Sequence, residues 1–332
     1  MSVGCVTATR DGGSDFGADP SNPEAADANA AERTESTSER IVGGTTTNDF
    51  SSTVLILDGN KFTPHGELCT GTLIGKRTIL SAAHCIDGMS GQPTIYFGSD
   101  VGNANDPTFL GVLDVKAYGT HPQWNAWNLA NDLSILVLAE DAPTAPSPIL
   151  ASPLSTDMVG TDLTLVGFGN TGGTGVSSVG KKRVAHTPLD TFDAKTLAWT
   201  DTQHNTCPGA SGGPAFMTFS GARVLVGVTS YGDQNCQFSG VDTRVDAYVA
   251  SFILPTMQSY GDTPVLYDAT TGNATTPSAP TPAPDADPSA NSGSVADSCG
   301  GSCGGQAASG CWCDTQCSKF GDCCTDKAAI CG

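Results

Sequence analysis

Residues 207–214 read CPGASGGP, and this stretch places one serine among glycines. A serine hydroxyl is a weak nucleophile near neutral pH and needs an adjacent base. Flanking glycines let the backbone turn tightly and direct amide N–H groups toward a developing oxyanion. Ser211 is therefore a candidate nucleophile, although a serine among glycines, taken alone, is most often an ordinary loop residue.

Two other segments supply the groups that such a nucleophile requires. Residues 78–85 read TILSAAHC, and residues 131–138 read NDLSILVL. His84 follows an apolar run and is flanked by small residues, while Asp132 stands at the start of another apolar run. Histidine can act as the base, and a buried aspartate can fix its tautomer and stabilise the imidazolium. Together the three segments are far more specific than any one of them.

The region from residue 41 to about 258 has the pattern of an all-β fold. Short apolar runs recur between Gly, Asn, Asp and Pro, which favours an antiparallel sandwich or barrel. These runs are Thr53–Leu57, Thr72–Ile74, Thr78–Ser81, Thr94–Phe97, Leu133–Leu138, Leu163–Phe168 and Val224–Thr229. One helical period closes the region, from Val245 to Leu254, and Pro255 follows it.

These motifs and their order along the chain resemble the trypsin/chymotrypsin type of serine protease. SAAHC, NDLSIL and GASGGP resemble the segments around its catalytic residues. IVGG at 41–44, VGFG at 166–169 and TSYG at 229–232 resemble its mature N-terminus, a mid-chain segment and its substrate-binding strand. The resemblance covers about 41–258. It implies a chymotrypsin-like double six-stranded antiparallel β-barrel with a C-terminal helix, and a triad in the cleft between the barrels.

The resemblance also implies a role for individual residues. His84 is expected to be the general base, Asp132 its orienting partner and Ser211 the nucleophile of a serine endopeptidase that forms an acyl-enzyme. The amides of Gly209 and Ser211 are expected to form the oxyanion hole. Disulfides are expected between Cys69 and Cys85, and between Cys207 and Cys236. The expected partners are protein or peptide substrates, and no cofactor or metal is expected.

The chain departs from the family pattern at the residue before the nucleophile. The resemblance implies cleavage between Arg40 and Ile41, with 1–40 as an acidic, disordered pro-segment. The new N-terminal ammonium would then pair with an aspartate, but Ala210 stands in that position. Three alternatives follow: an oxyanion hole that is ordered without this ion pair, another acid such as Asp242 or Asp201 in that role, or a non-catalytic binding or adhesion protein on a protease fold.

Substrate specificity is expected to depend on four positions. By resemblance, Asn205 lies at the floor of the specificity pocket, Gly232 and Gly240 form its walls, and Ser230 belongs to the strand that binds the substrate backbone. A neutral floor favours a large apolar or polar side chain. Asp242, two positions beyond Gly240, would restore a preference for cations if it reached the base of the pocket.

The last part of the chain has a different composition. Residues 259–297 form an expected linker rich in Pro, Ala and Thr. Residues 298–332 form an expected disulfide-rich module that resembles somatomedin B domains and has eight cysteines: Cys299, Cys303, Cys311, Cys313, Cys317, Cys323, Cys324 and Cys331. The resemblance implies that it binds a protein partner; a compact protease-resistant cap is the alternative.

Charge and cysteine content indicate the compartment. The formal net charge of -19 opposes binding to nucleic acid. The sequence has no apolar run of about 18 residues, so no transmembrane helix is expected. The cysteine-rich end predicts an extracellular or cell-surface protein. The start MSVGC resembles the end of a bacterial lipoprotein signal, which would make Cys5 a lipid anchor; a stray thiol in a flexible tail is the alternative.

Overall fold

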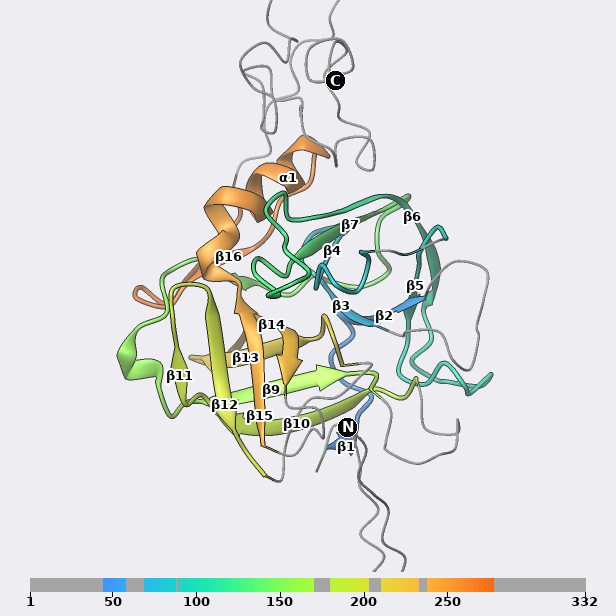
Figure 1. Cartoon of the computed structure of the whole chain (residues 1–332). Helices are drawn as coiled ribbons and strands as arrows, with labels where there is room; N and C mark the ends of the chain where they lie inside the picture. The colour runs from blue at the N-terminus through green and yellow to red at the C-terminus, as the bar shows by residue number, and fades with distance from the viewer. Residues whose placement is uncertain are drawn as a thin grey trace, which may run out of the picture. The chain divides into compact units, whose positions relative to one another are not determined.

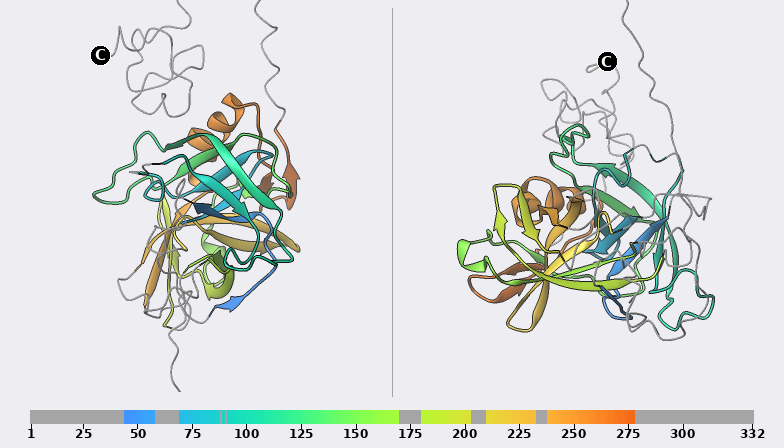
Figure 2. Two further views of the ribbon diagram at one scale, coloured as in Figure 1. Left: turned by 90° about the vertical axis from the view of Figure 1, so that its right-hand side faces the viewer. Right: turned by 60° about the horizontal axis from the view of Figure 1, so that its bottom comes forward.

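The computed structural model describes residues 44–57, 69–87, 89, 91–169, 180–202, 210–232 and 238–277. Within these residues the chain forms two β-sheets, the first from residues 53–138 and the second mainly from residues 149–275, with one short strand at residues 45–46 added to it. Figure 1 shows the first sheet in blue to green and most of the second in yellow-green to orange, and Figure 2 shows both sheets from two further sides.

The first sheet is a closed barrel in the strand order β2-β3-β4-β7-β6-β5, and all its pairs are antiparallel. Its strands are β2 (Thr53–Leu57), β3 (Cys69–Leu73), β4 (Thr78–Ser81), β5 (Thr94–Phe97), β6 (Gly111–Thr120) and β7 (Ser134–Leu138). Thr, Val, Ile and Leu dominate β2 and β7, and such residues pack well on a pleated surface. Closure leaves this sheet without an open edge.

The second sheet has eleven strands, and its main path runs β1-β10-β9-β13-β14-β15-β12-β11. These strands are β1 (Thr45–Thr46), β9 (Asp162–Gly167), β10 (Arg183–Pro188), β11 (Thr191–Phe192), β12 (Thr196–Thr200), β13 (Pro214–Phe219), β14 (Ala222–Gly232) and β15 (Ser239–Arg244). The expected double barrel is therefore seen as one closed six-stranded barrel and one larger sheet. The second sheet exceeds six strands because its main path alone has eight, and three further short strands pair onto it outside this path.

Those additional strands are β8 (Ile149–Leu150), β16 (Leu266–Asp268) and β17 (Asn273–Thr275). β8 pairs in parallel with both β14 and β16, and β16 forms an antiparallel pair with β17. Tyr267 of β16 is buried in the core of this sheet. Residues 260–277, expected to begin the linker, thus pack onto the sheet because an apolar strand there covers β8.

The expected C-terminal helix is present but does not end at Pro255. A helical segment runs through η3 (Asp246–Tyr248), the π-helical η4 (Val249–Ile253) and α1 (Leu254–Ser259). Pro255 lies in the first turn of α1, a position that tolerates proline better than later turns of a helix do. One short 3-10 helix, η1 (Thr156–Met158), precedes β9.

The two sheets meet where β2 contacts β9, β3 contacts β13 and β4 contacts β14. One apolar cluster joins them, with Val54 and Ile79 from the barrel and Val166 and Phe216 from the second sheet. β4 leads directly to His84, and β14 ends beside Ser230, so this junction brings the expected site residues together. No helix in the described part of the chain is long and apolar enough to cross a membrane.

Candidate active site

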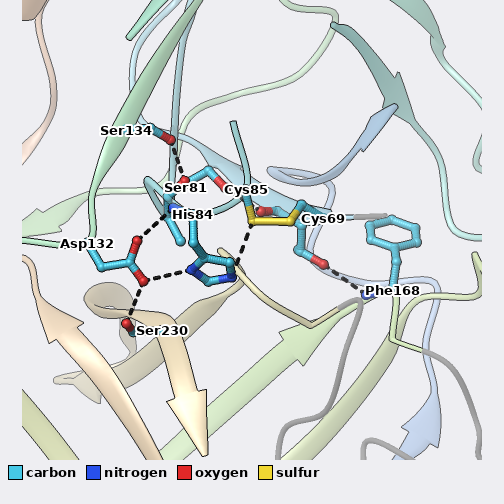
Figure 3. The surroundings of a disulfide bond; sticks show 10 residues. Cys69, Ser81, His84, Cys85, Asp132, Ser134, Phe168 and Ser230 are labelled. Atoms are coloured by element: carbon cyan, nitrogen blue, oxygen red, sulfur yellow. Dashed lines mark hydrogen bonds and ion pairs between the residues drawn. A yellow bond between two sulfur atoms is a disulfide. The ribbon is translucent and has the colours of Figure 1, made fainter. Parts of the chain in front are cut away.

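His84 and Asp132 form the centre of the site. His84 Nδ1 lies 2.7 Å from Asp132 Oδ2, and the His84 backbone N–H donates to Asp132 Oδ1 at 2.9 Å (Figure 3). Asp132 is completely buried, while about a quarter of the His84 side chain is exposed, at 27%. One carboxylate therefore holds both the backbone and the ring of His84, and the ring still reaches solvent.

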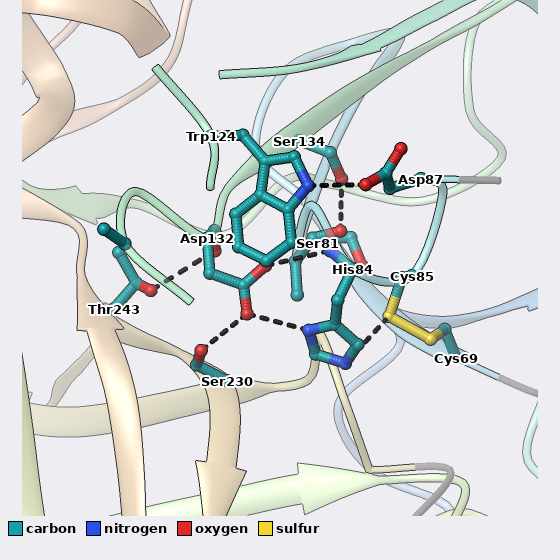
Figure 4. A network of polar contacts seen from close by, with 12 residues as sticks. Cys69, Ser81, His84, Cys85, Asp87, Trp124, Asp132, Ser134, Ser230 and Thr243 are labelled. Atoms are coloured by element: carbon teal, nitrogen blue, oxygen red, sulfur yellow. Dashed lines mark hydrogen bonds and ion pairs between the residues drawn. A yellow bond between two sulfur atoms is a disulfide. The ribbon is translucent and has the colours of Figure 1, made fainter. Parts of the chain in front are cut away.

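Two strands of the second sheet support Asp132 from the other side. The Ser230 hydroxyl at the end of β14 donates to Asp132 Oδ2 at 2.5 Å, and the Thr243 hydroxyl of β15 donates to the Asp132 carbonyl at 3.2 Å (Figure 4). The structure thus places the Ser230 side chain on the carboxylate. That Ser230 also belongs to the strand that binds the substrate backbone stays a prediction.

This geometry selects the tautomer of His84. An ionised carboxylate only accepts hydrogen bonds, so the proton of a neutral His84 ring must be on Nδ1. Nε2 is then an acceptor, directed away from Asp132. A histidine in this state can take a proton from a hydroxyl group at its exposed edge.

Backbone hydrogen bonds place Ser211 at the junction of the two sheets. The Thr70 N–H of β3 donates to the Ser211 carbonyl at 2.8 Å, and the Gly212 N–H donates to the Thr229 carbonyl of β14 at 2.8 Å. Gly212 has φ +76°, a region that strongly favours glycine. A Cβ atom there would lie 2.1 Å from Ser81 Oγ, so the backbone after Ser211 packs tightly against the barrel.

The Ser211 hydroxyl makes no hydrogen bond to His84 within the described residues. His84 Nε2 lies 3.9 Å from Cys85 Sγ. Hydrogen bonds between catalytic groups are often long in the absence of substrate. Cys85 is bonded to Cys69, as expected, at an S–S distance of 2.02 Å. Cys69, His84 and Cys85 lie close enough to hold a metal ion, but both sulfurs are used in the disulfide and offer no thiolate.

Comparison with known sequences identifies the family of this domain. The sequence model of trypsin matches residues 41–253. The chain belongs to the trypsin family. It is 30% identical to a trypsin of Saccharopolyspora erythraea over an alignment of 231 residues that covers 63% of this chain and 94% of that protein. It is 27% identical to trypsin CFT-1 of Choristoneura fumiferana over an alignment of 241 residues that covers 64% of this chain and 89% of that protein.

A multidomain relative is also similar in this region. Vitamin K-dependent protein C of Rattus norvegicus is 29% identical over an alignment of 244 residues that covers 63% of this chain and 50% of that protein. The family match ends at residue 253 and gives no support for a somatomedin B-like domain at the C-terminus.

In this member of the trypsin family, Ala210 is buried beside Ser211 with only 1% of its surface exposed. It packs against Ala185 of β10. A Cβ atom placed on Gly167 would lie 3.0 Å from Ala210 Cα, so little space surrounds it. Small residues therefore fill the position next to Ser211, and none of these three side chains carries a charge.

The glycines expected to line the specificity pocket are closely covered. A Cβ atom on Gly240 would lie 2.2 Å from Cζ2 of Trp199, and one on Gly232 would lie 2.7 Å from the Ser239 carbonyl oxygen. The Trp199 ring thus packs directly over Gly240. Six further expected site residues lie outside the described residues: Arg40, Ile41, Asn205, Cys207, Gly209 and Cys236.

Asp242 lies on the same face of β15 as Gly240 and is completely buried. It pairs across the sheet with Leu197 of β12 and Thr229 of β14. Among the residues that the structure describes, neither carboxylate oxygen has a hydrogen-bond partner, and the same is true of the buried Trp199 Nε1. Burial raises the pKa of Asp242 well above its ordinary value, and the neighbouring Thr229 side chain opposes only part of that shift.

Sequence reasoning did not identify Thr70 and Ser81 as supports of the site. The Ser81 hydroxyl donates to the Thr70 carbonyl at 2.8 Å, and Thr70 Oγ1 accepts from the Phe168 N–H at 3.0 Å. Thr70 thereby connects β3 with the segment after β9 and with Ser211. The only local signal was that both residues belong to apolar strands in which a buried hydroxyl needs a partner.

Proposed function

We propose that this trypsin-family domain is a serine endopeptidase that uses Ser211, His84 and Asp132. The observation that carries the proposal is the contact of His84 Nδ1 with Asp132 at 2.7 Å, with Ser230 on the same carboxylate oxygen. This arrangement leaves Nε2 as the acceptor on the exposed side of the ring. The Thr70–Ser211 backbone bond supports a position for the nucleophile beside it.

The proposed mechanism follows from these positions. As Ser211 Oγ attacks the carbonyl carbon of a peptide bond, His84 Nε2 takes the hydroxyl proton, and Asp132 stabilises the resulting imidazolium. His84 then gives the proton to the leaving amine, which departs and leaves an acyl group on Ser211. Water, deprotonated by His84, hydrolyses the acyl-enzyme. The amides of Gly209 and Ser211 are the proposed donors to the oxyanion.

The packing around Ala210 supports an oxyanion hole that does not require an ion pair with the new N-terminus. An ammonium buried next to Ala210, Ala185 and Gly167 would have no counter-ion there, and such a charge is costly to desolvate. Cleavage between Arg40 and Ile41 would then release a leader without being the switch for activity. The alternative is an ion pair of the N-terminus with Asp201 or Asp242.

Two substrate preferences remain under this proposal, and they depend on different residues. A neutral Asn205 at the pocket floor favours uncharged side chains, whereas Asp242 at the pocket base would favour Lys or Arg. The Trp199 ring over Gly240 supports a shallow pocket and thus an uncharged substrate side chain. A peptide library that varies the residue before the cleaved bond separates these preferences. Cleavage after uncharged residues supports the first, and cleavage after Lys or Arg supports the second.

The remaining parts of the chain extend the proposal. Disulfide-bonded members of the trypsin family are commonly secreted, which supports an extracellular or cell-surface location with protein substrates. Residues 298–332 are proposed to form a somatomedin B-like module that binds a protein partner. A lipid on Cys5 would tether the enzyme to a membrane, and mass spectrometry of the mature N-terminus tests this.

Labelling with a fluorophosphonate tests the proposed activity. The wild-type chain is expected to give one adduct on Ser211 and to cleave a denatured protein substrate. Ser211→Ala should lose both, while Ser155→Ala, which changes a serine before η1 whose hydroxyl bonds to Asp157, should retain both. If the wild type gives no adduct, either before or after cleavage at Arg40, the proposed endopeptidase activity is wrong.

A non-catalytic binding protein is the second candidate function, and Ala210 is the observation that favours it. Such a protein would bind its partner equally well as wild type and as Ser211→Ala. The same pair of proteins therefore separates the two functions: hydrolysis that depends on Ser211 supports the first, and binding without hydrolysis supports the second.

A further inference from the structure

Asn131, the residue before Asp132, has an unusual backbone conformation and a side chain with three hydrogen bonds. Its φ is +56°, a left-handed value that asparagine adopts more readily than most residues. Its Nδ2 donates to the Gln123 carbonyl at 2.7 Å. Its Oδ1 accepts from Lys195 Nζ at 2.6 Å and from the Tyr248 hydroxyl at 3.0 Å. The turn into the triad aspartate is therefore held from three directions.

The three partners of Asn131 come from segments that are distant in the sequence. Gln123 lies in the loop after β6 of the barrel, Lys195 in the turn between β11 and β12, and Tyr248 at the end of η3. Thr243 of β15 binds the Asp132 carbonyl itself. The barrel alone therefore does not fix the Asp132 segment; the second sheet and the C-terminal helical segment are bonded to it as well.

The turn that presents Lys195 is itself held in place. Asp193 Oδ1 accepts from the backbone N–H groups of Lys195 and Thr196, and the Lys195 carbonyl accepts from the Arg244 N–H at 2.9 Å. Arg244 in turn pairs with Asp246 at 2.5 Å in a nearly buried contact. The ammonium of Lys195 therefore extends from an ordered backbone, although its own side chain is exposed.

The geometry points to Asn131 as a positioning residue for Asp132, with Lys195 and Tyr248 acting through it. This inference rests on the proposed function, because it assigns Asn131 to the orientation of the proposed triad. Catalytic groups lose activity when they are displaced by a fraction of their hydrogen-bond distance. Substrate does not contact Asn131 in this arrangement, so loss of its bonds should lower kcat and leave KM nearly unchanged.

Steady-state kinetics of the full chain on one peptide substrate test this inference. Asn131→Gly keeps the left-handed conformation accessible and removes all three side-chain bonds. It should lower kcat by about 10- to 100-fold, with KM changed by less than about two-fold. Asn128→Gly is the matched control, since Asn128 lies in the same loop and its side chain accepts only from the Ala130 N–H. It should keep the wild-type kcat.

Two partner variants make the test independent of the folding of Asn131→Gly. Tyr248→Phe removes only the hydroxyl, and Lys195→Met removes the ammonium, so each should lower kcat by a few-fold. Lys195→Arg retains a cationic donor and should restore most of the lost kcat. A wild-type kcat in both Tyr248→Phe and Lys195→Met overturns the inference, as does an effect confined to KM. If the wild type is active and these variants show no loss of kcat, only the role of Asn131 is wrong and the proposed protease function stands. If the wild type is neither labelled nor active, the proposed function and the role of Asn131 are both wrong.

Discussion

The Ser230 hydroxyl lies 2.5 Å from Asp132 Oδ2, and the same carboxylate oxygen also contacts His84 Nδ1. Ser230 thus lowers the negative charge that His84 meets, while it fixes the rotation of the carboxylate. Ser230→Ala should lower kcat/KM by about 10-fold, because one hydrogen bond to a charged group is lost. Asp132→Asn should lower kcat/KM by about four orders of magnitude, because an amide at this position selects the wrong His84 tautomer.

The two variants can be compared through their adducts with a fluorophosphonate. The rate of labelling should follow wild type > Ser230→Ala > Asp132→Asn. Equal labelling rates for wild type and Asp132→Asn would show that Asp132 does not assist the nucleophile.

Gly212→Ala should unfold or inactivate the domain. The alanine would have to adopt φ near +76°, which is strained for a residue with a side chain. Its Cβ would lie 2.1 Å from Ser81 Oγ and 2.4 Å from the Thr70 carbonyl oxygen. Gly221→Ala is the control, because φ is +83° there and no atom lies within 4 Å of the added Cβ. Gly221→Ala should lower the free energy of unfolding by about 1–2 kcal/mol, from backbone strain alone. Thermal unfolding of both variants checks the difference, and equal losses would contradict the tight packing at Gly212.

Ala210→Asp should destabilise the protein rather than restore a missing ion pair. A carboxylate in the space between Ala185 and Gly167 would be buried without a cation, at a cost of about 3–5 kcal/mol. Thermal unfolding should show this loss before and after cleavage at Arg40. Recovery of stability on cleavage would instead show that the new N-terminus reaches residue 210.

Lys182 should make stability rise with pH in the alkaline range. Burial lowers the pKa of Lys182 to about 8, an effect that attraction to Asp106 and Asp49 only partly opposes. Between pH 8 and 10.5 the unfolded chain holds a proton that the folded chain has lost, so the free energy of unfolding rises with pH. Lys182→Met lacks this increase, which amounts to about 3 kcal/mol. Urea unfolding of both proteins at pH 7 and pH 10 measures it, and parallel pH curves would contradict it.

Asp242 should have the opposite dependence in the acidic range. Its raised pKa means that the folded protein keeps a proton which the unfolded chain releases above about pH 4. Stability is therefore lost as pH rises toward the pKa of the folded state, by up to about 1.4 kcal/mol per pH unit. Asp242→Asn should remove this slope in urea unfolding between pH 4 and 7. An unchanged slope would show that Asp242 has a charged or hydrogen-bonding partner.

Much of the barrel could be read from the sequence, because its strands are short apolar runs between turn residues. The predicted runs Thr53–Leu57, Thr78–Ser81 and Thr94–Phe97 coincide with β2, β4 and β5. The run Leu133–Leu138 differs from β7 by one residue. β6 was not predicted, because charged and exposed residues alternate through it, as expected where one face meets solvent.

The supports of the site could not be read in the same way. The bonds of Thr70 to Ser211 and of Asn131 to Lys195 join residues more than 60 positions apart. Local motifs contain no information on such distant contacts, whereas His84 and Asp132 stand in segments whose flanking residues are distinctive. The contact between Trp199 and Gly240 was missed for the same reason: it depends on the register of β12 against β15.

The parallel pairing of β8 with β16 bears on how this trypsin-family domain can be handled in isolation. A recombinant product that stops at residue 258 would remove Tyr267 from the core and expose the backbone of β8 to other chains. Such an open edge invites self-association. Expression boundaries for crystallisation or assay should therefore extend beyond β17, which ends at Thr275.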